Sequence, residues 1–203
     1  MDFDIAVSRN EIIPSSVTDD LVASLRAEGL RVEEEERENE VFGALEWLVP
    51  TAIIVFIAKE YVGTLLQEAA KDHYPKIKQS LSKLVSRTTG AEREVKLQYM
   101  ASSPGKVDPG KVPITMSVIS SLRDGRRVKF VFEHELTVEH HEQAVGEMFE
   151  VLASHFAEYP EDRITTKIPP EGTWPKNEVI MRFDGDKSFD WVIVDIRPKP
   201  GAA

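Results

Sequence analysis

The chain has no cysteine among its 203 residues. Disulfide bonds, thiolate zinc sites and cysteine nucleophiles are therefore excluded. The glycine-rich GxGxxG and GxxxxGK[ST] phosphate loops are also missing, as is the GxSxG turn of serine hydrolases. Because no catalytic set can be assembled, the sequence predicts no catalytic residue and no cofactor, and it favours a non-enzymatic protein over an enzyme.

Basic charge is scarce: 25 Lys and Arg stand against 35 Asp and Glu, which gives a net charge of −10. Such a surface repels phosphate backbones, and this argues against nucleic-acid binding. The N-terminus, MDFDIAV, has acidic residues where a signal peptide has basic ones, so we expect a cytoplasmic protein. The sequence leaves open whether the chain forms homo-oligomers.

Acidic charge is concentrated in residues 1–48, which hold 13 acidic and 4 basic side chains. Its densest part is the run EEEERENE at 33–40. A solvated strand edge or helix start is the simplest interpretation of this run. The functional hypothesis is a surface that binds a protein partner with a basic face. The residues predicted to form it are Glu33, Glu34, Glu35, Glu36, Glu38 and Glu40.

Long apolar runs are absent, and the stretch WLVPTAIIVFIA at 47–58 has only twelve residues. A helix needs about 20 apolar residues to cross a bilayer, so a membrane span is not expected. The β-branched residues after Pro50 favour a strand buried on both faces, with a buried helix as the alternative. Peripheral membrane attachment through this run and the lysine-bearing segment that follows is a further alternative function.

The first part of the chain predicts a β-α-β-type unit. Residues 3–7 alternate as a strand, and Ser15 or Ser16 can cap a helix that Gly29 closes. Residues 30–34 can form a second strand. The apolar positions of 61–85 lie three or four apart, which predicts a long amphipathic helix, or two helices joined at Pro75.

The second part has the alternation of half-buried strands at 95–99, 114–118 and 128–132, with a hairpin turn at Asp124-Gly125. Thr137 caps a predicted helix over 138–158. Its expected core positions are Val138, Val145, Met148, Phe149, Leu152 and Phe156. Two more strands follow, near 178–183 and 188–196.

The predicted fold is therefore α/β plus α+β. An N-terminal α/β half with a long helix spans 1–88, and a C-terminal antiparallel sheet of order β-β-β-α-β-β with one packed helix spans 94–203.

Histidines offer the densest set of possible ligands, in Glu133-His134-Glu135 and Glu139-His140-His141-Glu142. On a helix, His141 falls beside the apolar stripe whereas His140 points away, so the two do not readily share one ion. We therefore predict no metal site. His73 continues the apolar stripe of its own helix, which indicates a histidine at the edge of the core.

Residues 3–66 carry the segments FDIAVSRNE, EGLRVEEEE and PTAIIVFIAKEY, separated by a helix and a loop. This order resembles the start of a TIR domain. The resemblance implies an NAD-cleaving enzyme or a self-assembling signalling domain as an alternative function. It also implies a pocket where Ser8, Arg9 and Asn10 meet Glu68, although Glu68 lies two positions short of the glutamate that the family uses.

Overall fold

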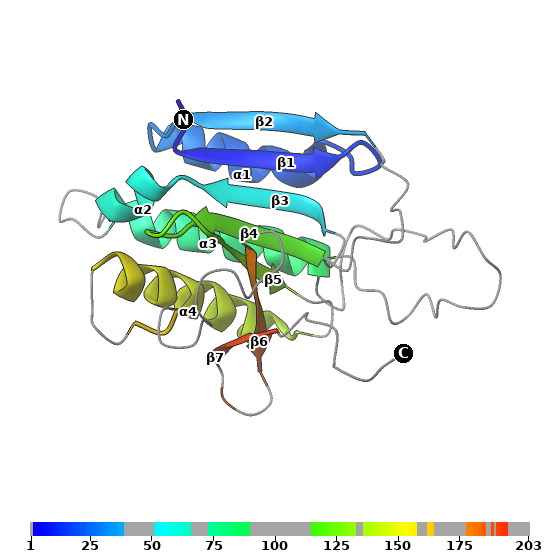
Figure 1. The fold of residues 1–203 in the computed structure, drawn as a ribbon. Coiled ribbons are helices and arrows are strands. Elements are labelled where there is room, and N and C mark those ends of the chain that lie inside the picture. The colour runs from blue at the N-terminus through cyan, green and yellow to red at the C-terminus, as the bar shows by residue number, and fades with distance from the viewer. Residues whose placement is uncertain are drawn as a thin grey trace, which may run out of the picture.

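A computed structural model describes residues 2–38, 51–65, 73–89, 115–132, 136–157, 162–164, 178–185, 188 and 190–194. The elements in chain order are β1 Ile5–Asn10, α1 Ser16–Ala27, β2 Val32–Arg37, β3 Thr51–Ile57, α2 Lys59–Leu65, α3 His73–Thr89, β4 Thr115–Ser121, β5 Arg127–Phe132, α4 Val138–Phe156, β6 Glu178–Asp184 and β7 Asp190–Ile193. The strands form one seven-stranded sheet in the order β2-β1-β3-β4-β5-β6-β7. Figure 1 shows this sheet with β2 at its upper rim.

The sheet is mixed, and its directions follow from the connections. Helices link β1 to β2, β3 to β4 and β5 to β6, and each of these pairs is parallel. The other neighbours, β1 with β3, β4 with β5 and β6 with β7, are antiparallel. The predicted mixed α/β fold with C-terminal antiparallel strands is confirmed. One pairing differs from the expectation: β5 and β6 run parallel, because α4 carries the chain back before β6 begins.

The apolar run was predicted to hold a strand, and β3 confirms this. It pairs with β1 on one side and with β4 on the other. Ile53, Val55 and Ile57 are buried on one face, while Ala52, Ile54 and Phe56 are half-buried on the other. A strand with apolar side chains on both faces needs neighbours on both edges, so it occupies an interior position.

Helices α1, α3 and α4 pack side by side on one face of the sheet (Figure 1). Strands β1 and β5 run in the same direction. From β1 the chain crosses to β2 toward one end of the sheet, whereas from β5 it crosses to β6 toward the other end. With their helices on the same face, the β1-α1-β2 and β5-α4-β6 crossovers must have opposite hands. About 98% of such crossovers are right-handed, so one of the two has the rare hand.

The core fills the layer between this sheet face and the helices. Val17, Leu21, Val22 and Leu25 of α1 form one apolar stripe, and all four are buried. At the other end, Trp191 packs edge-to-face on Phe130 and Phe132, with ring centroids 4.9 and 5.1 Å away. Its indole N–H donates to the carbonyl of Ala144 in α4 at 2.9 Å. A buried Trp with its polar N–H satisfied thus joins α4 to the sheet.

Two local predictions are wrong. Ser15 precedes α1 but makes no side-chain capping bond. Its carbonyl instead accepts from the Thr18 hydroxyl at 3.1 Å, and its backbone already has helical dihedral angles. Val138 is 62% exposed because it is the first residue of α4, ahead of the turn that contacts the core. Thr137, by contrast, caps α4 as predicted, since its hydroxyl accepts from the His140 N–H at 3.3 Å.

Both predicted halves contribute to one sheet and one core. Strand β3, from 1–88, pairs with β4, from 94–203, and α3 packs on α4. The predicted long helix is represented by α2 and α3, with Pro75 in the first turn of α3. The predicted strand at 95–99 lies outside the described residues. A division into two domains stays a prediction.

Truncating the central strand tests the core. Ile53→Ala should lower the free energy of unfolding by about 2–5 kcal/mol, because Ile53 is 2% exposed and the change leaves a cavity. The matched control is Ile12→Ala, at an isoleucine that is 48% exposed, which should change the value by less than about 0.5 kcal/mol. Urea unfolding measures both variants, and equal losses would contradict the central position of β3.

Candidate functional site

The predicted binding residues lie on an edge of the sheet. Glu33, Glu34, Glu35 and Glu36 belong to β2, the first strand in the sheet order, and all four are exposed. Glu38 is exposed just beyond the strand, and Glu40 lies outside the described residues. The solvated-edge interpretation of the sequence is therefore confirmed for the strand itself.

The strand divides its glutamates between two faces. Glu34 pairs with Arg26 of α1 at 2.9 Å, and Glu36 pairs with Arg9 of β1, so both carboxylates lie on the helix side. Successive strand residues alternate, which puts Glu33 and Glu35 on the opposite face. Within the described part of the chain, neither of these two makes an ion pair. The face away from the helices therefore carries the uncompensated charge.

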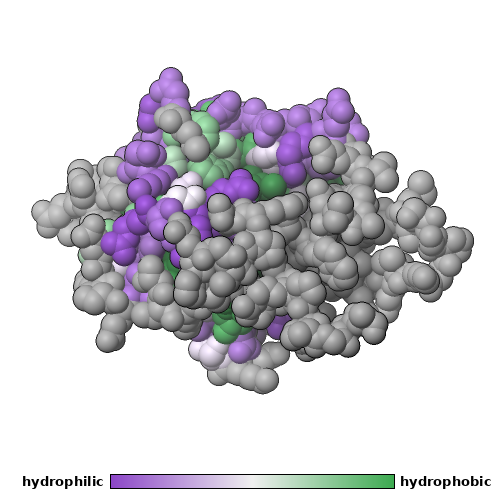
Figure 2. All heavy atoms as spheres, viewed as in Figure 1, coloured by the Kyte–Doolittle hydropathy of each residue, from purple (hydrophilic) through white to green (hydrophobic). Residues whose placement is uncertain are grey.

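Apolar and small residues border these two carboxylates. The register sets Glu33 beside Ala6 and then Phe56, and Glu35 beside Ser8 and then Ile54. All four neighbours are half-buried. Figure 2 shows hydrophilic residues along the rim where β2 lies and hydrophobic residues below them on this face. We call Glu33 and Glu35 together with the outer backbone edge of β2 the acidic edge.

The pocket implied by the TIR resemblance is not assembled by the described residues. The Arg9 guanidinium donates to the carbonyl of Ile13 at 2.8 Å, and the Asn10 side chain accepts from the Ile12 N–H at 3.1 Å. Both groups thus hold the turn after β1. Because β3 is antiparallel to β1, the chain leaves β3 at the start of β1, where the Ala58 N–H donates to Asp4. Glu68 follows that exit and lies outside the described residues.

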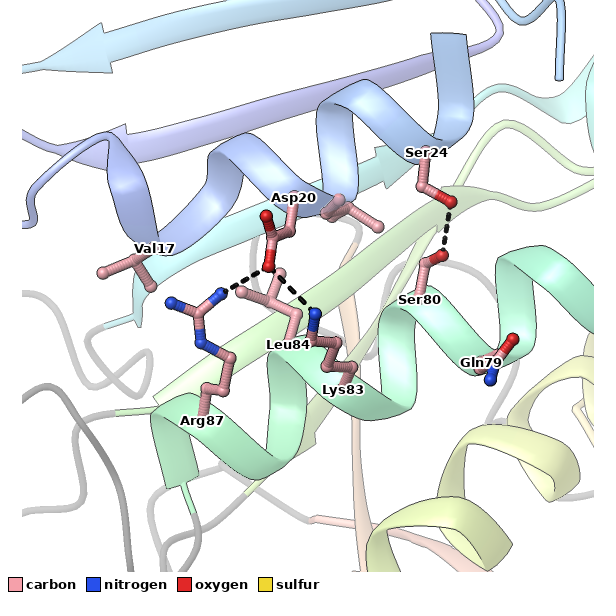
Figure 3. A pocket seen from close by; sticks show the side chains of 9 residues that line it. Val17, Asp20, Ser24, Gln79, Ser80, Lys83, Leu84 and Arg87 are labelled. Atoms are coloured by element: carbon pink, nitrogen blue, oxygen red, sulfur yellow. Dashed lines mark hydrogen bonds and ion pairs between the residues drawn. The ribbon is translucent and has the colours of Figure 1, made fainter. Parts of the chain in front are cut away.

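The lysine-bearing face of the long-helix region contacts α1. Lys83 and Arg87 of α3 both reach Asp20, at 2.9 and 3.3 Å, and Ser24 and Ser80 hydrogen-bond at 2.8 Å (Figure 3). These residues line a groove of about 250 Å³ between the helices. The hydrogen bond from Lys83 lowers the pKa of Asp20. Lys83 and Arg87, two of the basic side chains that the membrane hypothesis needs at a lipid surface, are here bound to a carboxylate of the same chain.

No helix in the described ranges is long and apolar enough to cross a bilayer. The same residues contain no group of three histidines or carboxylates placed to hold a metal ion. Glu133, His134 and Glu135 lie outside the described ranges, and His73 is half-buried at the start of α3.

His141 is fully buried in α4. Its Nε2 lies 3.2 Å from the Thr89 hydroxyl at the end of α3, while Nδ1 is buried without a hydrogen-bond partner among the described residues. Burial, assisted by the neighbouring His140, lowers the pKa of His141 to about 4. The neutral ring therefore joins α3 to α4 as a core side chain. The prediction that His141 lies beside the apolar stripe of its helix is confirmed.

A buried His155–Asp162 pair was missed by the sequence interpretation. The His155 Nδ1 lies 3.3 Å from the Asp162 carboxylate, and both side chains are at most 1% exposed. An acid–base role would need a free lone pair on the imidazole. Here Nε2 accepts from the Arg123 N–H at 3.1 Å, and Asp162 also accepts from the Ile164 N–H at 2.9 Å. The pair fastens residues 162–164 to α4 and to the β4–β5 turn, and no local sequence pattern links its members.

Acid titration tests the burial of His141. In the unfolded chain a histidine protonates near pH 6.5, whereas the folded protein resists protonation of His141 down to about pH 4. Its contribution to stability is therefore complete above pH 6.5 and is lost as the pH falls toward 4. Compared with His141→Gln, the wild type should lose up to about 1.4 kcal/mol more per pH unit in this window. Urea unfolding from pH 7 to 4.5 measures it, and parallel profiles would refute the buried neutral state.

Comparisons with known proteins returned no match: no family model, no curated protein and no solved structure is similar to this chain. The candidate site therefore rests on its own geometry. Among the described residues, the acidic edge combines accessible charge with a strand at the end of the sheet.

Proposed function

We propose that this protein is a non-enzymatic interaction module that captures a protein partner with a basic face through the acidic edge. The observation that supports the proposal is the position of Glu33 and Glu35 on an exposed terminal strand, without ion pairs in the described part of the chain. Uncompensated carboxylates attract a basic partner at long range and accelerate its association.

The chemistry of the other polar clusters supports this choice. The lone pair of His155 Nε2 is not free for proton abstraction, because it already accepts a backbone hydrogen bond from Arg123. The cations of the α1–α3 groove share Asp20. The carboxylates of Glu34 and Glu36 are neutralised by arginines of the same chain. Glu33 and Glu35 differ from all of these groups, since an incoming cation can reach them without breaking an internal pair.

Charge reversal tests the proposal. The double variant Glu33→Lys with Glu35→Lys should no longer capture the partner from native cells. Quantitative mass spectrometry measures the captured proteins. The control is Glu142→Lys with Glu150→Lys, which gives the same net charge on exposed positions of α4 and should retain the partner. With the purified partner, the first variant should associate about tenfold more slowly at low salt and with a flatter salt dependence. Identical captured proteins and rates for all three forms would overturn the proposal.

A further inference from the structure

The backbone of β2 offers hydrogen-bonding groups at the rim of the sheet. The Ile5 and Glu11 N–H groups donate to the carbonyls of Arg31 and Arg37, at 3.3 and 2.9 Å, so these odd-numbered residues face β1. In a parallel ladder only every second residue bonds to a given neighbour. The even-numbered residues therefore direct their peptide groups outward. Val32 agrees, because its carbonyl accepts from the Arg26 guanidinium of α1 at 3.0 Å.

Glu34 and Glu36 thus present their backbone N–H and C=O groups to the outside. No hydrogen bond engages these outward groups within the part of the chain that the structure describes. An open strand edge of this kind is a template for an added strand. Along β2, the glutamates that such a strand would meet alternate between those without and those with an arginine partner among the described residues. Glu33 and Glu35, on the outer face, make no ion pair within the described ranges, whereas Glu34 and Glu36 are held by Arg26 and Arg9 on the helix side.

A second copy of the chain does not fit this edge. Antiparallel pairing of β2 with itself would set Glu33 and Glu35 of one copy opposite glutamates of the other. Like charges in directly opposed positions destabilise a strand pair. A segment with lysine or arginine at every residue is also disfavoured, since every second basic side chain would meet Arg26 or Arg9. The edge fits a strand in which basic and uncharged residues alternate.

We infer that the partner of the acidic edge is an extended segment that adds to β2 as an antiparallel strand, with basic residues at every second position. Its basic side chains lie opposite Glu33 and Glu35, in the non-hydrogen-bonded pairs where side chains approach most closely. Its uncharged residues lie opposite Glu34 and Glu36 and exchange backbone hydrogen bonds with them. This inference rests on the proposed function and specifies the chemistry of its partner.

Two synthetic decapeptides of identical composition test the charge pattern. One alternates lysine and threonine, and the other has five lysines followed by five threonines. Fluorescence anisotropy should show the alternating peptide binding about fivefold more tightly to the wild-type protein, and the Glu33→Lys with Glu35→Lys variant should lose this preference. Equal affinities for the two peptides would overturn strand addition, even where charge-dependent capture of the partner persists.

N-methylation of the alternating peptide tests the backbone bonds. Methylating the threonine amides should abolish binding, because those N–H groups face β2, whereas methylating the lysine amides should leave it intact. The opposite result would replace antiparallel with parallel addition, and equal effects of the two changes would overturn the inference. Failure of every peptide to bind would also overturn it, while the proposed function is judged separately by partner capture.

A variant of the protein provides a second test that leaves the ladder to β1 in place. Glu34→Pro removes an outward N–H, and Glu34→Ala removes the same side chain but keeps that N–H. A terminal strand tolerates proline where its N–H faces solvent. Glu34→Pro should bind the alternating peptide at least about fivefold more weakly than Glu34→Ala. Circular dichroism confirms that both variants are folded, and equal affinities of the two folded variants would contradict strand addition.

Discussion

The structure depends on the burial of β3. This strand carries apolar side chains on both faces, so it must have neighbours on both edges, and it obtains them from β1 and β4. Strand β1 precedes β3 in the sequence and β4 follows it at residue 115. By pairing with both, β3 joins the two parts of the chain in one sheet. Burial of apolar surface is the dominant favourable contribution to folding. With β3 and β1 inside the sheet, β2 forms its rim.

The position of β2 at the rim of the sheet makes the acidic edge out of the glutamate run at 33–36. A run of glutamates in a loop would be a diffuse charge, but in β2 the period of two separates the run into two sets. One set stabilises the packing of β2 on α1 and β1 through arginines. The other set is left to face the solvent beside half-buried apolar residues of β1 and β3. Charges and unpaired peptide groups at an edge protect a sheet from self-association, and they also select a partner of opposite charge.

The elements were predictable where local signals are strong. The β-branched residues after Pro50 and the Thr137 cap are local signals of a few residues, and the strand and the helix start that they predict agree with the structure. The failures were also local in origin. Ser15 has a capping side chain but a helical backbone, and Val138 continues an apolar period one turn beyond the surface that α4 buries.

By itself, the sequence determined most of the described secondary structure, the lack of thiol chemistry and the acidic character of residues 33–36, because propensity, periodicity and charge are properties of neighbouring residues. The tertiary structure alone decided the strand order, the parallel pairing of β5 with β6 and the contact of His155 with Asp162. It also decided that Glu36 meets Arg9 and Glu34 meets Arg26, while Glu33 and Glu35 make no ion pair with any residue that the structure describes. These outcomes depend on contacts between distant segments, which a pattern of burial along the chain cannot specify.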